Sequence, residues 1–203
     1  KTSRMERGFE EDEEEQRVMD NYSQFSTFFY PKNIAVIGVS PVKNNLGKNI
    51  VLNCLYFGYP GEIIPVGLSK GVVYGQRIYE SIENIDRDID LAVILTPAKT
   101  IPGILEQCGR KGIKHAVIES GGFSELGKEG EPLEQACVEV ARRYGIRFIG
   151  PNGIGVTNLE NGMVLPFMPL RRDITLGPVS ILAQSGGVGL SYLNILAEEN
   201  IGV

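Results

Sequence analysis

Residues 33–47 read Asn33-Ile-Ala-Val-Ile-Gly-Val-Ser-Pro-Val-Lys-Asn-Asn-Leu-Gly47, and this stretch decides the fold. Its first part, Ile34–Gly38, is an apolar, β-branched run that ends at a glycine, which is typical of a buried strand. Gly47–Phe57 follows with the apolar spacing of a helix. Because the loop between them has a glycine at each end, its backbone N–H groups can approach a phosphate at the helix N-terminus. The loop lacks the G-x-G-x-x-G pattern, and a surface turn is the alternative interpretation.

The same alternation of strand and helix continues along the chain. Short apolar runs predict further strands at 62–66, 91–96, 115–119 and 147–149, and amphipathic spacing predicts helices at 100–111 and 129–144. Strands of this kind alternating with helices indicate a parallel sheet covered on both faces. We therefore predict an α/β fold, a Rossmann-like doubly wound parallel sheet, over residues 25–155. Phe25, Phe28 and Phe29 have helical spacing and predict a short helix that docks an apolar face.

The two ends of the chain differ from this middle part. Residues 10–15 read Glu-Glu-Asp-Glu-Glu-Glu, so we expect residues 1–24 to be an acidic, disordered tail. Residues 156–177 predict a connector. Pro178–Ala183 then predicts a strand, and the following helix is expected to run to about Glu199. We expect residues 178–203 to be the first βα unit of a second, flavodoxin-like α/β domain that the chain leaves incomplete.

Composition narrows the range of functions. The chain has 203 residues and a net charge of −5, and its acidic block alone accounts for that excess. With no basic surface indicated, we expect no nucleic-acid partner. The apolar runs are far shorter than the ~20 residues of a membrane span, so we expect no membrane partner. Three separated cysteines and one histidine predict no metal site and favour a cytoplasmic protein.

Candidate binding residues follow the predicted strands, because ligands of such sheets bind at the carboxyl ends of the strands. After the second strand, an NAD site usually places an acidic residue, but this chain has Lys70. A cation suits a phosphorylated ribose, either in NADP or at the 3′-phosphate of coenzyme A; a solvated lysine is the alternative. The later loops offer small or polar residues, namely Thr96, Pro97, Ala98, Glu119, Ser120, Gly121 and Asn152. Asn152 is equally suited to capping a turn.

Two further places carry candidate chemistry. Ser185, Gly186 and Gly187 open the last predicted helix, where a hydroxyl, glycine amides and the helix dipole favour an anion. Because Ala183 stands where G-x-S-x-G would have its first glycine, we prefer phosphate binding there to a nucleophile. His115 begins a predicted strand, at the end of the sheet away from the ligand loops, and is interpreted as structural. The three cysteines, Cys54, Cys108 and Cys137, are interpreted as small buried apolar side chains.

Six segments in register resemble one family: the CoA-binding domain of NDP-forming acyl-CoA synthetases and of the succinyl-CoA synthetase α subunit. They are Phe29-Tyr-Pro-Lys-Asn-Ile-Ala-Val-Ile-Gly-Val-Ser40, Pro65-Val-Gly-Leu-Ser-Lys70, Asp90-Leu-Ala-Val-Ile-Leu-Thr-Pro-Ala98, Glu119-Ser-Gly-Gly-Phe-Ser-Glu125, Ile149-Gly-Pro-Asn-Gly-Ile-Gly-Val156 and Leu182-Ala-Gln-Ser-Gly-Gly187. The resemblance begins near Phe29, so the acidic tail lies outside it.

The resemblance implies that the ligand is coenzyme A or acyl-CoA, lying across the carboxyl edge of the sheet. It implies phosphate contacts from the loop after the first strand, and Lys70 at the charged nucleotide end. The implied loop residues are Gly38, Val39, Ser40, Asn45, Leu46 and Gly47. It further implies that Ser185–Gly187 holds phosphate. The family interconverts acid, CoA and NTP with acyl-CoA, NDP and phosphate, through a phosphohistidine and an ATP-grasp domain or subunit.

Some family features have no counterpart in these 203 residues. His115 does not match the phosphohistidine, so we expect no catalytic residue here and no turnover by this chain alone. Gly153 replaces a cysteine found in many relatives, and Leu190 replaces a tyrosine of the succinate-type enzymes, which disfavours succinate. Two other functions stay open: the CoA-sensing half of a synthetase-like protein acetyltransferase, and an NADP-binding Rossmann regulator.

Overall fold

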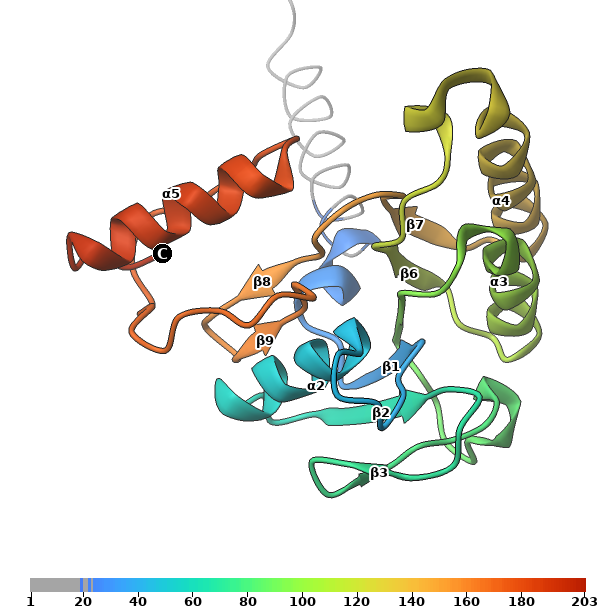
Figure 1. Cartoon of the computed structure of the whole chain (residues 1–203), viewed down its shortest axis with the longest axis horizontal. Coiled ribbons are helices and arrows are strands. Elements are labelled where there is room, and N and C mark those ends of the chain that lie inside the picture. Colours follow the sequence, from blue (N-terminus) through green and yellow to red (C-terminus); the bar gives the residue numbers. More distant parts are fainter. Residues whose placement is uncertain (1–18, 20–21, 23) are drawn as a thin grey trace, which may run out of the picture.

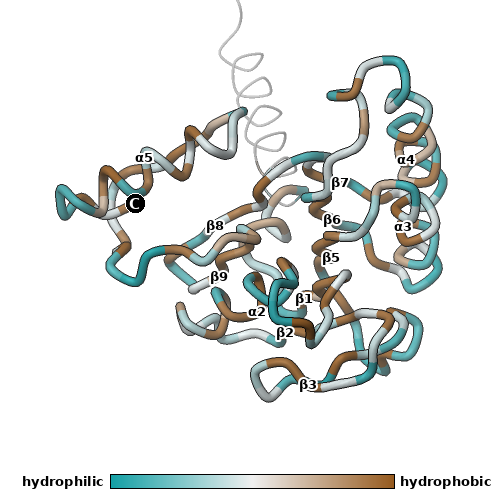
Figure 2. Tube along the Cα trace, in the orientation of Figure 1, coloured by the Kyte–Doolittle hydropathy of each residue, from teal (hydrophilic) through white to brown (hydrophobic). Residues whose placement is uncertain are grey.

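A computed structural model describes residues 19, 22 and 24–203. Its centre is a five-stranded parallel sheet in the order β2-β1-β5-β6-β7 (Figure 1). These strands are β1 Asn33–Ile37, β2 Glu62–Val66, β5 Leu91–Ile94, β6 His115–Ile118 and β7 Arg147–Ile149. The predicted strands are thus confirmed: β2 and β7 have the predicted bounds, β1 is shifted by one residue, and β5 and β6 end two residues and one residue earlier than predicted. The central strands are apolar on both faces because helices and loops cover both (Figure 2).

The helices divide between the two faces of the sheet. On one face lie α3 (Ile101–Arg110) and α4 (Glu131–Tyr144), packed against each other and over a core that includes Ile94 and Ile118. On the other lies α2 (Leu46–Tyr56) with the hairpin of β8 (Thr157–Asn158) and β9 (Met163–Val164). A second core cluster, including Val117, fills this side. The doubly wound arrangement predicted from the sequence is therefore confirmed.

Smaller elements complete the domain. A hairpin of β3 (Val72–Val73) and β4 (Gln76–Arg77) follows β2, and 3₁₀ helices span Ile82–Asn84, Ala98–Thr100 and Ser124–Glu129. The helix predicted over 129–144 begins only at Glu131, after the last of these turns. The helix predicted over 100–111 is α3, one residue shorter at each end; the Thr100 hydroxyl before it donates to the Pro97 carbonyl at 2.7 Å and does not cap the helix.

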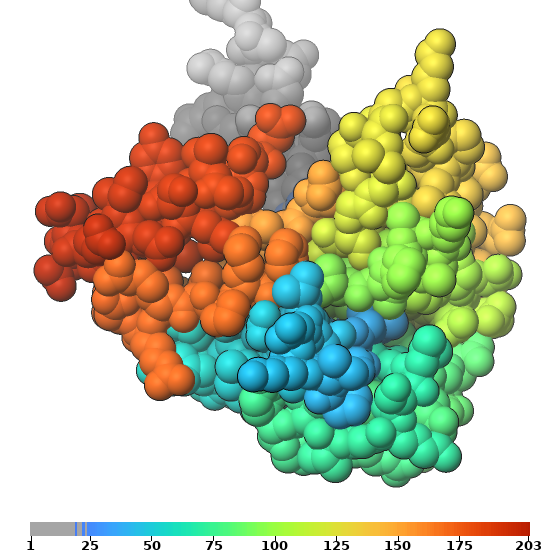
Figure 3. Space-filling view, viewed as in Figure 1, coloured from blue at the N-terminus to red at the C-terminus, as the bar shows by residue number. Residues whose placement is uncertain are grey.

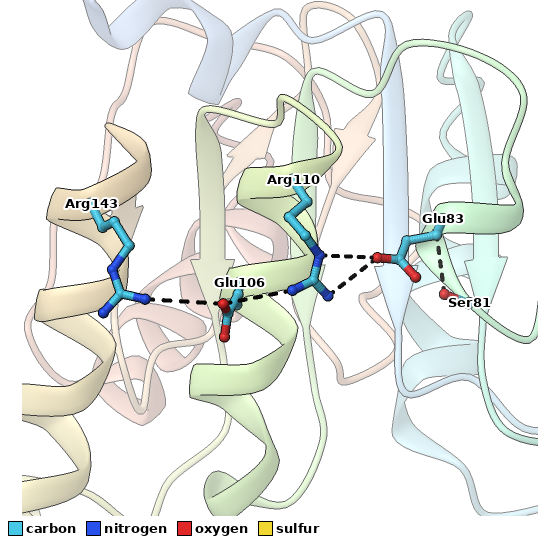
Figure 4. Close-up of polar contacts among 5 residues, drawn as sticks. All are labelled: Ser81, Glu83, Glu106, Arg110 and Arg143. Atoms are coloured by element: carbon cyan, nitrogen blue, oxygen red, sulfur yellow. Dashed lines mark hydrogen bonds and ion pairs between the residues drawn. The ribbon is translucent and has the colours of Figure 1, made fainter.

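A row of exposed charges links the outer side of α3 to its neighbours (Figure 4). Arg110 contacts Glu83 at 3.2 Å and Glu106 at 3.6 Å, and Glu106 also lies 4.0 Å from Arg143 on α4. All four side chains are about 40–60% exposed. Exposed pairs of this kind each contribute about 0–1 kcal/mol, so the buried core stabilises this face.

The chain enters the sheet at the amino ends of the strands. Residues 24–29 are helical, and Phe28 is 2% exposed, with its ring edge-on to His115 at 5.0 Å between centroids. Phe25 and Phe29 stay nearly half exposed. The predicted docked helix is confirmed, with Phe28 as its anchor. The acidic block and the rest of residues 1–18 lie outside the described residues.

The C-terminal part forms a lobe beside the main domain (Figure 3). Its helix α5 (Gly186–Glu198) agrees with the predicted helix. The strand predicted over 178–183 is wrong: these residues join no sheet in the described part of the chain, and Leu182 is fully exposed. A strand needs a neighbour to accept its backbone hydrogen bonds, and none lies beside this run. Each helix in the described part of the chain is too short or too polar to span a lipid bilayer.

Candidate functional site

The strand order places the topological switch point of the sheet between β1 and β5. From β1 the chain moves outward to β2, then returns to the other side of β1 to form β5. Counted over the parallel strands the order is 2-1-3-4-5, which has its switch point between the first and third of them. Ligands of doubly wound sheets bind at that point, outside the carboxyl ends of the strands. The loops after β1 and β5 are therefore the centre of the candidate site.

Gly38 lets these two loops meet. It has φ +107°, and a Cβ there would lie 2.0 Å from the Leu95 carbonyl oxygen. Its N–H and that of Val39 both donate to the Val66 carbonyl at 2.9 Å, which ties the β1 loop to the end of β2. Glycine is thus required here by the close approach of the two backbones, a reason that the sequence did not indicate; the predicted approach of this loop to a phosphate stays a prediction.

Asn45 closes the loop from Gly38 to Gly47. Its Oδ1 accepts hydrogen bonds from the backbone N–H groups of Lys48 and Ser40, each at 3.1 Å, and so caps α2. Its Nδ2 donates to the Gly38 carbonyl at 2.8 Å. One side chain therefore holds both ends of the loop at the positive end of the helix dipole. The predicted phosphate loop is brought together, with Asn45 as its brace and Ser40 half-buried beside it.

Ser120 joins the next three loops. Its hydroxyl donates to the Thr96 carbonyl at 2.6 Å and accepts from the Thr96 N–H at 3.0 Å. Its own carbonyl accepts from the Asn152 N–H at 2.9 Å. Ser120 is 8% exposed, whereas Pro97, Gly121 and Asn152 lie open at the edge. The residues predicted from separate loops thus form one continuous edge.

Lys70 lies beyond β2, beside the β1 loop. Its side chain is 80% exposed and its Nζ lies 3.4 Å from a Glu80 carboxylate oxygen. Lys70, Glu80 and Arg77 line a hollow of ≈ 200 Å³. Glu80 was not predicted as a site residue, because only the β3–β4 hairpin, which lies between the two in the sequence, brings it back beside Lys70. Tyr74-Gly75, at the hairpin's tip, is the sequence signal that could have indicated the return.

Two carboxylates in the loop after β6 differ in environment. Glu125 accepts hydrogen bonds from the N–H groups of Gly122 and Phe123, and these lower the pKa of its carboxyl. Glu119 is 3% exposed, and burial raises its pKa well above the usual range. Predicted as a CoA-contacting residue, Glu119 has a side chain that faces the interior; only its backbone lies near the edge.

Ser185, Gly186 and Gly187 lie at the start of α5, with Ser185 as the N-cap. Ser185 Oγ accepts from the Val188 N–H at 3.5 Å. A Cβ at Gly186 would lie 2.5 Å from Cγ2 of Ile154, so the start of α5 packs on the segment after β7. A cleft of ≈ 660 Å³ separates the rest of this lobe from residues 154–160. The helix start is exposed and close to the carboxyl edge, as the prediction of an anion site requires.

The residues interpreted as structural lie away from this edge. His115 begins β6 at the amino edge, where its Nε2 lies 3.3 Å from the Gln24 carbonyl oxygen. Cys54, Cys108 and Cys137 are free and buried. In the described residues no group of His, Cys, Asp or Glu could hold a metal ion.

The doubly wound sheet carries a loop with a glycine at each end, a capped helix start and a flanking lysine. Together these features define a Rossmann-like nucleotide-binding domain. The family model described as "CoA binding domain" matches residues 32–158. The chain therefore belongs to the CoA-binding domain family, and its ligand is coenzyme A. The matched residues include the loops after all five strands, although the positions of individual CoA contacts stay predictions.

Similar proteins agree on the kind of enzyme. The α subunit of acetate–CoA ligase (ADP-forming) I from Pyrococcus furiosus is 40% identical over 179 residues, 86% of this chain and 38% of that protein. Acetate–CoA ligase (ADP-forming) II from Archaeoglobus fulgidus is 42% identical over 158 residues, 78% of this chain and 23% of that protein. The apo dinucleotide-forming acetyl-coenzyme A synthetase 1 of Ca. Korarchaeum cryptofilum is 31% identical, covers 88% of this chain and 38% of that one, and has a TM-score of 0.82. The chain thus spans 38% or less of each of these relatives.

Proposed function

We propose that this chain is the CoA-binding segment of an acyl-CoA synthetase (NDP-forming), which joins a carboxylic acid to CoA and converts NTP to NDP and phosphate. The continuous edge formed by the loops after β1, β5, β6 and β7 is the observation that carries the proposal. Relatives named acetate–CoA ligase (ADP-forming) support the reaction, and one named 4-hydroxybutyrate–CoA ligase (ADP-forming) is 31% identical. Acetate is accordingly the first acid to test, with ADP as the nucleotide.

In this proposal the chain holds CoA and does not perform the phosphoryl transfer. The loop braced by Asn45 offers backbone N–H groups to the CoA phosphates at the start of α2. Lys70 faces the ribose phosphate, once that phosphate displaces the exposed Glu80 carboxylate. His115 lies at the opposite edge of the sheet, so we assign the phosphoryl group to a histidine outside residues 1–203, and NTP to an ATP-grasp domain or subunit.

The synthetase assay runs in reverse, which gives a direct readout. The protein that carries this segment is incubated with acetyl-CoA, ADP and phosphate, and we expect ATP and free CoA in equal amounts. The 203-residue chain alone is expected to give neither. Acetyl transfer from acetyl-CoA to protein lysines without any nucleotide requirement would instead identify the acetyltransferase alternative.

A further inference from the structure

Glu119 is a buried acid that CoA binding does not explain. It follows the last residue of β6 and is 3% exposed. Neither of its carboxyl oxygens has a hydrogen-bond partner among the protein atoms described. Burying an ionised carboxylate without a partner is far more costly than burying the neutral acid. The packed site therefore holds the protonated form, in line with the raised pKa that burial gives this group.

The carboxyl group packs directly on the backbone of Gly155. Gly155 has φ +82°, and a Cβ there would lie 2.3 Å from Glu119 Oε1 and 2.9 Å from the Leu165 Cβ. Glu119 and Leu165 thus leave no room for a side chain at position 155, and only glycine fits there. Alternation along β6 places Glu119 on the same side of the sheet as Val117, the side covered by α2 and the β8–β9 hairpin.

Among the described residues no cation offsets the charge of an ionised Glu119, since burial is the cause of its raised pKa. The segments that contain Gly155 and Leu165, 153–156 and 164–166, consist of glycine, proline and aliphatic residues. On α2 the titratable neighbour is Cys54, whose pKa is raised to about 12, mainly by burial and to a smaller extent by Glu119 itself. Lys48, also on α2, places its Nζ 3.4 Å from the carbonyls of Pro41 and Val42. Ionised Glu119 would therefore have to leave this site to find a partner.

Glu119 also sits between the two parts of the candidate site. The residue after it, Ser120, is bonded to Thr96 at the carboxyl edge. The residue before Gly155, Ile154, packs on Gly186 at the start of α5. A movement of the Glu119 carboxyl would thus be passed to the CoA edge through Ser120 and to the start of α5 through Ile154.

We propose that Glu119 is a proton-operated latch, a positioning residue whose neutral acid can stay buried beneath segment 153–156 and whose ionisation, which that packed site cannot accommodate, releases the segment and the α5 start packed on it. When the segment opens, water reaches the carboxyl and its pKa returns toward about 4.3. Between that value and the raised value of the packed form, each pH unit multiplies the open fraction about tenfold. Below this window the latch stays closed at a constant level, and above it the open fraction is constant again.

Amide hydrogen exchange of the 203-residue chain between pH 5 and 8 tests the latch. Peptides covering 153–156 and 185–189 are followed by mass spectrometry, and rates are corrected for the chemical pH dependence of exchange. In the wild-type chain we expect the corrected opening of both regions to rise about tenfold per pH unit within the window. Glu119→Gln, which keeps the shape without the titration, should make both regions independent of pH.

The control is Glu129→Gln, an exposed carboxylate at the end of the neighbouring 3₁₀ helix, which should exchange like the wild type. Equal pH profiles in wild type and Glu119→Gln would overturn the proposal. If Glu119→Gln fails to fold, carboxyl carbon NMR of the wild-type chain decides. A Glu119 signal that titrates together with the exchange of 153–156 supports the latch, and a signal that titrates near 4.3 overturns it.

Discussion

At the scale of single residues, Lys70 is the exposed cation of the candidate site, and its Nζ already has a partner. It lies beyond β2, beside the β1 loop. The Glu80 carboxylate lies 3.4 Å from the Lys70 Nζ, the group that we propose for the ribose phosphate. With both side chains at least half exposed, this ion pair is weak and a dianionic phosphate can replace it.

Reversing this charge should weaken CoA binding without unfolding the domain. For Lys70→Glu we expect a ten- to hundredfold higher Kd, because losing a charge-assisted hydrogen bond costs roughly 1.5–3 kcal/mol. Titration calorimetry measures the change. Lys32→Glu, the same substitution just before β1 at the opposite edge, is the control and should bind CoA as the wild type does. An unchanged Kd in Lys70→Glu would mean that this lysine faces only solvent.

At the scale of elements, α2 is the helix on which the site depends. Its cap is also the brace of the phosphate loop, so helix stability and ligand binding are linked in Asn45. The spacing of apolar residues that predicts this helix does not indicate the double role of Asn45. That role arises from three hydrogen bonds between its side chain and backbone groups that the turn brings together.

Two substitutions of Asn45 separate the cap from the charge. Asn45→Ala should destabilise the fold by about 0.5–2 kcal/mol and raise the Kd for CoA, because the loop loses its brace. Asn45→Asp keeps the acceptor that caps α2, so most of the stability should remain, but a negative charge at the phosphate loop should weaken CoA binding. Thermal melts and calorimetry measure the two quantities. Equal CoA affinity in Asn45→Asp and wild type would argue against phosphate binding in this loop.

Elements with a clear period were predictable from the sequence, and contacts across the sheet were not. The buried runs at Ile34 and Leu91 indicated strands because both faces of a parallel sheet are apolar. The run at 178–183 is also rich in apolar residues, but without a neighbouring strand it stays unpaired. The Glu119 side chain was expected at the ligand edge, and whether it points outward or inward is decided by Gly155, which lies 36 positions later in the chain.

For the whole molecule, ligand-dependent stability is the simplest measure of specificity. A ligand at 100 times its Kd should stabilise the fold by about 2.7 kcal/mol. We expect CoA at millimolar concentration to raise the melting temperature of the chain, and NAD and NADP to leave it unchanged. A rise in melting temperature with NADP but not with CoA would favour the dinucleotide-binding regulator. Either ligand would use the same loops, which lie within the matched residues 32–158.

The docking of Phe28 on His115 gives this molecule a built-in spectroscopic reporter. The chain contains one histidine, so its imidazole resonances need no assignment by mutagenesis. The ring lies edge-on to Phe28 at 5.0 Å, within reach of that ring's magnetic anisotropy, and burial lowers the pKa of the imidazole. Undocking of residues 24–29 would move both the chemical shift and the titration midpoint toward those of a free imidazole. Because the proposed CoA site lies at the far edge of the sheet, the same signal separates changes at the chain's point of entry from events at that site.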